Sequence, residues 1–228
     1  MVGPRKITVT LNGPYLVEGA VPLAKQIIET DDEGQSRKWG QGEAFEAEAS
    51  YRLCRCGQSS EKPFCDDSHL KIGFDGTETA IGKPYLEQAE VLTGPTMDLT
   101  DAQPLCAFAR FCDPDGQIWN LIEATDDPDI VEKVKYESGH CPSGRLVVWD
   151  KTTKQPYEPV FAPSIGIVED PKLGVSGPLW VRGGITIESS KGRSYEVRNR
   201  VTLCRCGASS NKPFCDGSHA STEFKDGL

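Results

Sequence analysis

Apolar and polar residues alternate along several short segments of this chain, which is the pattern of half-buried β-strands. Gly-Pro pairs at 13–14 and 177–178 mark turns beside two of these segments. The segments that alternate in this way are 7–11, 15–18, 44–53, 179–181, 185–188 and 195–203. Short strands separated by turns predict a mainly β protein.

One segment in the middle of the chain has a helical pattern instead. Asp127 can cap a helix, Pro128 suits its first turn, and apolar residues recur on one face over 129–138. Gly139 is expected to end this helix, and 145–149 has the pattern of a following strand. The fold expected is therefore mainly β with short helices, in the α+β class.

The chain also repeats itself. Residues 54–69 read CRCGQSSEKPFCDDSH and residues 204–219 read CRCGASSNKPFCDGSH, so 13 of 16 positions match at an offset of 150. A looser echo pairs NGPYLVEG, from Asn12, with SGPLWVRG, from Ser176, at an offset of 164. The 14-residue difference predicts an insertion in the first copy, placed at the polar stretch 30–42 as a loop or hairpin tip.

The repeat divides the chain into three parts. We expect a first repeat at 1–80, a middle α+β segment at 81–170 and a second repeat at 171–228. The middle part has no counterpart elsewhere in the sequence, so its fold and chemistry are interpreted separately.

Composition narrows the function classes. The 228 residues carry a net charge of −9, which argues against nucleic acid as a partner. No run of 18 apolar residues predicts a membrane span, and the N-terminal stretch lacks the apolar core of a secretory signal. We therefore expect a soluble, cytoplasmic protein without a membrane anchor. In such a setting nine cysteines indicate thiolate ligands rather than a disulfide framework.

Each copy of the motif offers three cysteines and one histidine at the spacing C-x-C-x8-C-x3-H. These donors suit either a zinc ion or an iron–sulfur cluster. A single residue between the first two cysteines favours the larger centre, in which one iron takes the first two cysteines and the other takes the third cysteine and the histidine. Zinc in two Cys3His sites of a structural or interaction module is the alternative. The candidate ligands are Cys54, Cys56, Cys65 and His69 in the first copy, and Cys204, Cys206, Cys215 and His219 in the second.

The two stretches resemble the signature of the CDGSH iron–sulfur family of mitoNEET-like proteins, C-x-C-x2-S/T-x3-P-x-C-D-G-S-H. The second copy fits throughout, and the first departs only at Asp67, where the signature has glycine. Asp tolerates left-handed backbone better than most residues, so we expect the turn to survive. The resemblance implies one 2Fe–2S cluster per motif, held by three cysteines and one histidine. It also implies that motifs pair, here as an intramolecular pseudo-dimer in a monomeric chain.

Other motif residues are expected to support the ligands. Ser59 and Ser209 are candidate hydrogen-bond donors to sulfur, and Asp66 and Asp216 can cap a short helix. The remaining supporting residues are Pro63 and Pro213, which stiffen the approach to the third cysteine, and Ser68 and Ser218. The basic residues of the motif are interpreted as solvated surface or, alternatively, as charges that offset the cluster; they are Arg55, Lys62, Arg205 and Lys212.

Three cysteines of the middle segment belong to neither repeat. Cys106, Cys112 and Cys141 occur in LCAFARFC and CPSG, a pattern that faintly resembles divergent single-cluster ferredoxin domains. The spacing lacks C-x2-C, and His140, the only nearby histidine, adjoins Cys141. Buried structural thiols are therefore the favoured interpretation, with a third cluster or a reactive thiol pair as alternatives.

No Ser–His–acid set or phosphate-binding glycine loop is visible, so we do not expect an enzyme. The function expected is electron transfer or cluster transfer, with a redox or cluster-acceptor protein as partner. One imidazole in place of a thiolate removes a negative charge, which raises the reduction potential. The same imidazole binds protons in weak acid, so we expect the cluster to be lost faster below about pH 6.

Overall fold

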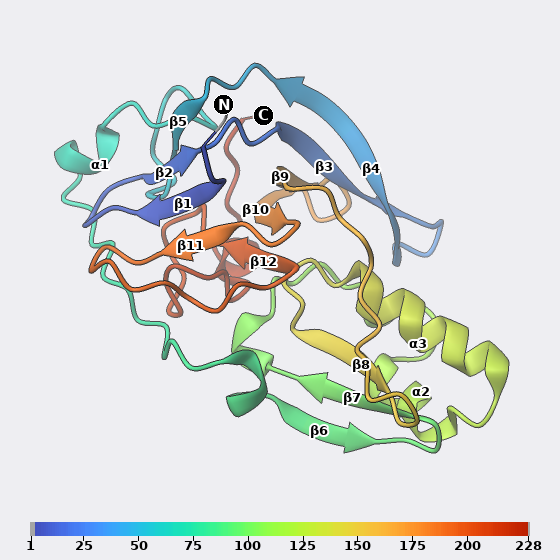
Figure 1. Ribbon diagram of the computed structural model, residues 1–228. Helices are drawn as coiled ribbons and strands as arrows, with labels where there is room; N and C mark the ends of the chain where they lie inside the picture. Colours follow the sequence, from blue (N-terminus) through green and yellow to red (C-terminus); the bar gives the residue numbers. More distant parts are fainter. Residues whose placement is uncertain (1–2, 228) are drawn as a thin grey trace.

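The computed structural model describes residues 3–227 of the chain. Its strands form three sheets, and only one of its α-helices is longer than four residues. The repeats build two of the sheets, and the third lies with the longest helix in a separate layer to one side (Figure 1). The expectation of a mainly β fold with short helices is confirmed.

The four-stranded sheet has the order β11-β1-β2-β5. Three strands come from the first repeat and pair antiparallel, whereas β11 comes from the second repeat and pairs parallel to β1. The strands are β1 (Lys6–Val9), β2 (Tyr15–Glu18), β5 (Ser50–Leu53) and β11 (Thr186–Glu188).

The five-stranded sheet has the order β12-β10-β9-β3-β4 and repeats the same plan. Here β3, from the first repeat, pairs parallel to β9, as β11 does to β1. The first repeat thus contributes β3 and its hairpin partner β4 to the second sheet, and the second repeat contributes β11 to the first sheet, so the two form an intramolecular pseudo-dimer. The strands are β3 (Leu23–Thr30), β4 (Ser36–Phe45), β9 (Ser164–Asp170), β10 (Val175–Arg182) and β12 (Arg200–Leu203).

The main core collects apolar side chains from both sheets. Leu53 and Leu203, which immediately precede the first cysteine of each motif, are fully buried in it. Along β10, Leu179 and Val181 belong to this core, whereas Trp180 belongs to a separate cluster. Because successive side chains of a strand point to opposite faces, Trp180 and Arg182 lie on the other face of the sheet.

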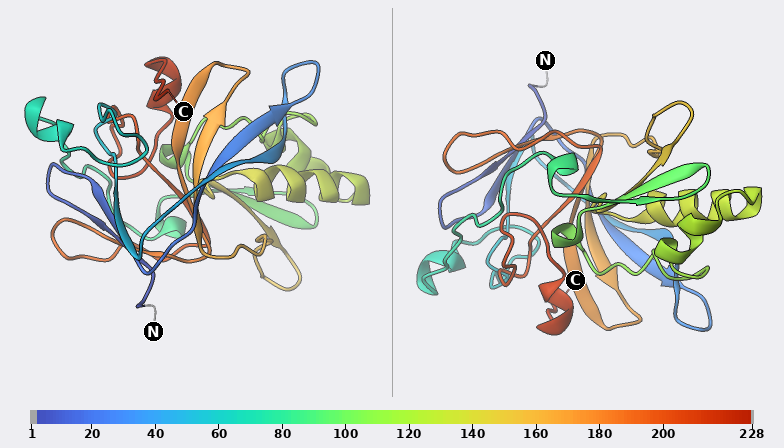
Figure 2. Two further views of the ribbon diagram at one scale, coloured as in Figure 1. Left: turned by 90° about the horizontal axis from the view of Figure 1, so that it is seen from above. Right: turned by 90° about the horizontal axis from the view of Figure 1, so that it is seen from below.

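The insertion in the first repeat is a hairpin rather than a loop. Its tip spans residues 31–35, and the whole of 36–42 belongs to β4. The hairpin extends beside the turn that joins β9 and β10 (Figure 2). The insertion lies where the sequence comparison predicted it. The strand β4 within it was not predicted, because its residues are mostly polar and one of its faces is exposed.

The middle segment folds as a three-stranded antiparallel sheet, β6-β7-β8, with helices packed on it. The predicted strand at 145–149 is β8, and the Asp127 carboxylate caps the predicted helix by accepting from the Asp129 amide at 2.9 Å. The helix continues through Gly139 and ends at His140, because the next residue, Cys141, precedes Pro142 and is extended. The elements are β6 (Glu90–Thr93), β7 (Met97–Asp101), β8 (Leu146–Asp150), α2 (Ile118–Leu121), α3 (Pro128–His140) and the 3-10 turns η1 (Tyr85–Glu87), η2 (Gln103–Leu105) and η3 (Ile122–Ala124).

Within residues 3–227, no helix is both long and apolar enough to cross a lipid bilayer.

Candidate metal centres

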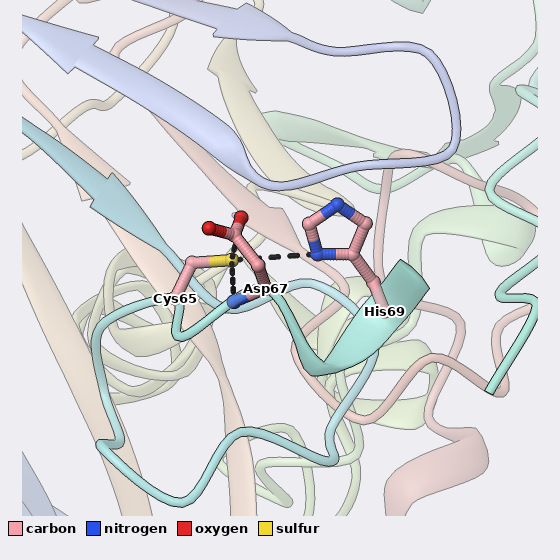
Figure 3. A group of neighbouring side chains, drawn as sticks. All are labelled: Cys65, Asp67 and His69. Carbon is pink, nitrogen blue, oxygen red and sulfur yellow. Dashed lines mark hydrogen bonds between the residues drawn. The ribbon is translucent and has the colours of Figure 1, made fainter. Parts of the chain in front are cut away.

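The donors of the first motif lie in two pairs. The sulfur atoms of Cys54 and Cys56 are 3.8 Å apart, and the sulfur of Cys65 is 3.5 Å from Nδ1 of His69. Cys54 directly follows β5, and His69 lies in the short helix α1 (Ser68–Lys71). Figure 3 shows the imidazole of His69 facing the sulfur of Cys65, with the Asp67 carboxylate beside them. The pairing expected from the sequence is therefore the pairing that the fold produces.

The second motif has the same geometry. The sulfur atoms of Cys204 and Cys206 are 3.8 Å apart, and the sulfur of Cys215 is 3.4 Å from Nδ1 of His219. The cysteine pair follows β12, and His219 lies in α4 (Ser218–Ser221). Burial lowers the pKa of His219 to about 4, with Arg205 adding to the effect, so the ring is a neutral donor at neutral pH.

Backbone hydrogen bonds fold each motif loop back on its strand. The Cys54 amide donates to the Pro63 carbonyl at 2.9 Å, and the Cys65 amide donates to the Arg52 carbonyl at 3.0 Å. The second motif repeats both bonds with Pro213 and Thr202 as acceptors. The fold thus places the third cysteine next to the first two, although eight residues separate them in sequence.

The serines and aspartates of the motif stabilise the loop rather than the sulfur atoms. The hydroxyl of Ser59 donates to the Phe64 carbonyl at 2.7 Å, so it does not serve the thiolates as expected. Asp66 accepts from both the amide and the hydroxyl of Ser60 and from the amide of Ser68. These bonds hold the pKa of Asp66 well below its usual range. Ser209, Asp216 and Ser218 make the corresponding contacts in the second motif.

The hydrogen bonds to sulfur come from backbone amides. The amides of Asp67 and Gly217 each donate to the sulfur two residues earlier, at 3.4 Å, and the Ala208 amide donates to Cys206 at 3.5 Å. The first two bonds need left-handed backbone, which Asp67 adopts with φ 67° and Gly217 with φ 89°. The expectation that Asp67 tolerates this turn is confirmed.

The two sites differ at Asp67. Its carboxylate lies 3.8 Å from the sulfur of Cys65 and makes a bidentate ion pair with Arg52, at 2.7 and 3.2 Å. In the second motif the equivalent residues are Thr202 and Gly217. An exposed ion pair therefore flanks the first site and is absent from the second.

The motif arginines are buried, so their interpretation as solvated surface is wrong. Arg55 and Arg205 are each 2% exposed. Arg55 donates to the carbonyls of Thr10 and Gly76, and Arg205 pairs with Glu169 and Asp226. Each guanidinium anchors its motif to neighbouring chain, which gives both arginines a structural role.

The two motifs face each other across the pseudo-two-fold axis. A side chain at Gly57 would begin 2.6 Å from the Cys206 carbonyl oxygen, and one at Gly207 would begin 2.7 Å from that of Cys56. The hydroxyl of Tyr15 donates a hydrogen bond toward the carbonyl oxygens of Cys204 and Pro213, which lie 2.8 and 3.0 Å from it. The second motif is therefore braced by a side chain of the first repeat, a contact that no sequence pattern indicated.

The three middle cysteines line one pocket. Its other lining residues include Phe108, Phe111 and Arg145, and among the described residues that line it there is no carboxylate or imidazole. The loop from Cys106 to Cys112 has left-handed backbone at Phe108 and Arg110. Burial raises the pKa of Cys112 to about 12. His140 turns away: its ring stacks on Tyr136 and Phe111, and Nδ1 lies 2.8 Å from the Tyr136 carbonyl.

This loop also touches the second motif. The Cys106 carbonyl oxygen and the Cβ of Phe108 lie 3.2 and 3.3 Å from where a side chain at Gly217 would begin. The middle cysteines are thus next to the second site, and glycine at 217 is what permits the approach.

Two families match this chain. The family described as iron-binding zinc finger, CDGSH type, matches residues 12–70 and 176–220, which contain all eight donors of the two motifs. The family described as a divergent 4Fe–4S mono-cluster matches residues 92–151, which contain the three middle cysteines. No curated protein and no solved structure matches the chain significantly.

The fold brings together two motifs, each with three cysteines and one histidine arranged as a candidate metal centre. The chain carries two iron-binding domains of the CDGSH type around a divergent 4Fe–4S domain, and the matches support iron–sulfur cluster binding. The middle match indicates a 4Fe–4S-type family for residues 92–151, the segment that contains Cys106, Cys112 and Cys141.

Proposed function

We propose that each CDGSH motif holds a 2Fe–2S cluster and that the protein transfers single electrons. The observation that carries this proposal is the division of each donor set into two pairs. Two donors 3.4 to 3.8 Å apart suit one tetrahedral metal, and each motif has two such pairs. A cluster of this type, when bound, accepts and returns one electron.

The same geometry argues against a single zinc ion. Four donors around one ion must all lie close together, yet among the described residues only Cys65, Asp67 and His69 form a group of three donors within 4.8 Å. Cys54 and Cys56 are not part of that group. The donor sets as they stand span a centre larger than one atom.

The middle segment supports a third cluster, of the 4Fe–4S type, on Cys106, Cys112 and Cys141. Three thiols around one pocket provide three ligands. The described residues that line the pocket include no carboxylate or imidazole that could be the fourth. We infer that a ligand from outside the chain, such as water, completes the set. Arg145, held by Asp101 at 2.6 and 2.7 Å, supplies positive charge at the pocket.

Electron transfer is the function that this arrangement favours. The middle cysteine loop contacts Gly217 of the second motif, and the second motif meets the first through Gly57 and Gly207. Three donor sets on loops that contact one another within one chain suit the passage of electrons between them and to a redox partner protein.

Delivery of a cluster to an acceptor protein is the second candidate. It is favoured by the first site, where Cys65 is only partly buried while its counterpart Cys215 is 2% exposed. The partly exposed Cys65 gives an acceptor protein access to one ligand of the first site.

Iron content and spectroscopy test both parts of the proposal, cluster binding and electron transfer. Anaerobically purified protein should be red-brown and carry about 8 irons per chain, two at each motif and four in the middle. Cys112→Ser should lower the count to about 4 while the 2Fe–2S electron paramagnetic resonance signal of the reduced protein remains. A colourless protein that contains zinc would overturn the cluster proposal. Clusters that cannot be reduced reversibly would overturn the proposed electron transfer but not the proposed cluster binding.

A further inference from the structure

A cleft lies apart from the cysteine sites, between the five-stranded sheet and α3. It has a volume of about 590 Å³. Its floor is the outer face of the sheet, and its walls are α3 and the segment that follows β8. Figure 2 shows α3 alongside the sheet strands that form the floor, in both views. No sequence pattern indicates this cleft, because its residues come from five separate stretches of the chain.

Aromatic rings line the cleft. Trp39 and Trp180 lie with ring centroids 4.5 Å apart, and Phe161 packs edge-on to Trp180 at 5.5 Å. The remaining aromatic lining residues are Tyr136, His140 and Tyr157. Rings in this number around one space suit a flat, unsaturated ligand that can stack on them.

A guanidinium inside the cleft has no acidic partner. Arg182 lies over the Trp180 ring, at 4.6 Å from its centroid, and donates to the Gln26 side chain at 3.2 Å. Among the described residues, no carboxylate lies within ion-pair distance of it, and burial lowers its pKa. A half-buried charge without a counterion is costly, so an anion that entered the cleft would be stabilised there.

Two buried donors at the same place are also unused. Nε of Arg182 and Nε1 of Trp180 have no hydrogen-bond partner, and Trp180 is 2% exposed. Buried donors are normally paired, so these two unpaired atoms add to the cost of leaving the Arg182 guanidinium without a counterion. The other charges of the cleft, Glu132 and Lys135, are 2.8 Å apart and neutralise each other.

We propose that this cleft binds a planar aromatic acid. Its ring system packs against the accessible rings of Trp39, Tyr157 and Phe161, and its carboxylate or phosphate group pairs with Arg182. A cationic aromatic ligand is disfavoured because Arg182 would repel it, and an uncharged one would leave the guanidinium without a counterion. The proposal does not depend on which clusters the cysteines hold.

The test compares matched probes on the full-length protein as purified, with its metal content unchanged. 2-Naphthoate and 2-naphthyl phosphate carry the acid, and 2-naphthamide is the uncharged control of the same shape. Isothermal titration calorimetry should show that at least one of the acids binds about tenfold or more tightly than the amide, as expected for a charge-assisted hydrogen bond to a guanidinium. The tighter of the two acids identifies the group that the site prefers.

Variants locate the site. Arg182→Gln should remove the advantage of the acid over the amide, whereas Arg5→Gln, which deletes one exposed charge elsewhere, should leave it unchanged. Quenching of tryptophan fluorescence by the bound acid should weaken in Trp39→Leu. Equal affinity for acid and amide in the unmodified protein, or no binding of either acid, would overturn the proposal without any variant.

Discussion

The ion pair of Arg52 and Asp67 should make the two CDGSH sites electrically different. Replacement of Asp67 by Asn removes a negative charge 3.8 Å from the sulfur of Cys65. Both side chains are nearly half exposed, so a water-like dielectric applies, and the interaction at that distance corresponds to about 40 mV for one electron. Because the added electron resides on iron beyond the sulfur, we expect the potential of the first site to rise by about 20–40 mV.

The measurement is a redox titration followed by electron paramagnetic resonance. Asp67→Asn should move one of the two 2Fe–2S waves upward and leave the other in place. The double variant Arg52→Thr with Asp67→Gly, which installs the residues of the second motif, should return the moved wave most of the way because the net charge is unchanged. Asp32→Asn, an exposed change of the same charge at the hairpin tip, serves as the control. Equal shifts of both waves, or a downward shift in Asp67→Asn, would refute the reasoning.

Three further predictions concern stability and pH. Burial raises the pKa of Glu137 to about 7, above its unfolded value near 4.3. The folded state therefore holds this proton more tightly than the unfolded state does. The free energy of unfolding is highest below about pH 4 and falls as the pH rises through 7. Glu137→Gln should therefore add up to about 3 kcal/mol to the free energy of unfolding at pH 8 and nothing at pH 4, measured in urea; an equal effect at both would contradict this. Gly57→Ala or Gly207→Ala should cost about 1–3 kcal/mol in thermal unfolding, because both glycines have positive φ and face a carbonyl oxygen at 2.6 to 2.7 Å. His69→Cys should slow the loss of visible absorbance at pH 5, since a thiolate ligand replaces a proton-accepting ring, and a time course identical to that of the unmodified protein would argue against histidine as a ligand.

Local sequence patterns predicted the parts of this molecule that depend on local chemistry. The duplicated motif identified two donor sets, and the fold brings each into the expected pairs. Alternation located β2, and Asp127 located the start of α3. These features depend on residues a few positions apart, which is the range over which periodicity and capping act.

Features that depend on distant contacts were not predictable in the same way. The hydroxyl of Tyr15 reaches Cys204, 189 positions away, and nothing near Tyr15 indicates an acceptor. Arg55 and Arg205 read as surface residues because a charged side chain beside a turn is usually solvated, yet tertiary carbonyls and carboxylates pair them in the interior. The strand β4 was missed because much of it is polar and partly exposed, so it lacks the alternation of a half-buried strand.

The exchange of β3 and β11 has a consequence for synthesis of the chain. The first sheet is complete only once Thr186–Glu188 has been made, about 120 residues after Cys65. At ~5–20 residues per second, a nascent chain would carry the thiols of the first motif for roughly 6–25 seconds before their supporting sheet can close. During that interval those thiols are open to oxidation and to unintended metals. The topology therefore favours a sequence of events in which iron enters the first site only when the chain is nearly finished.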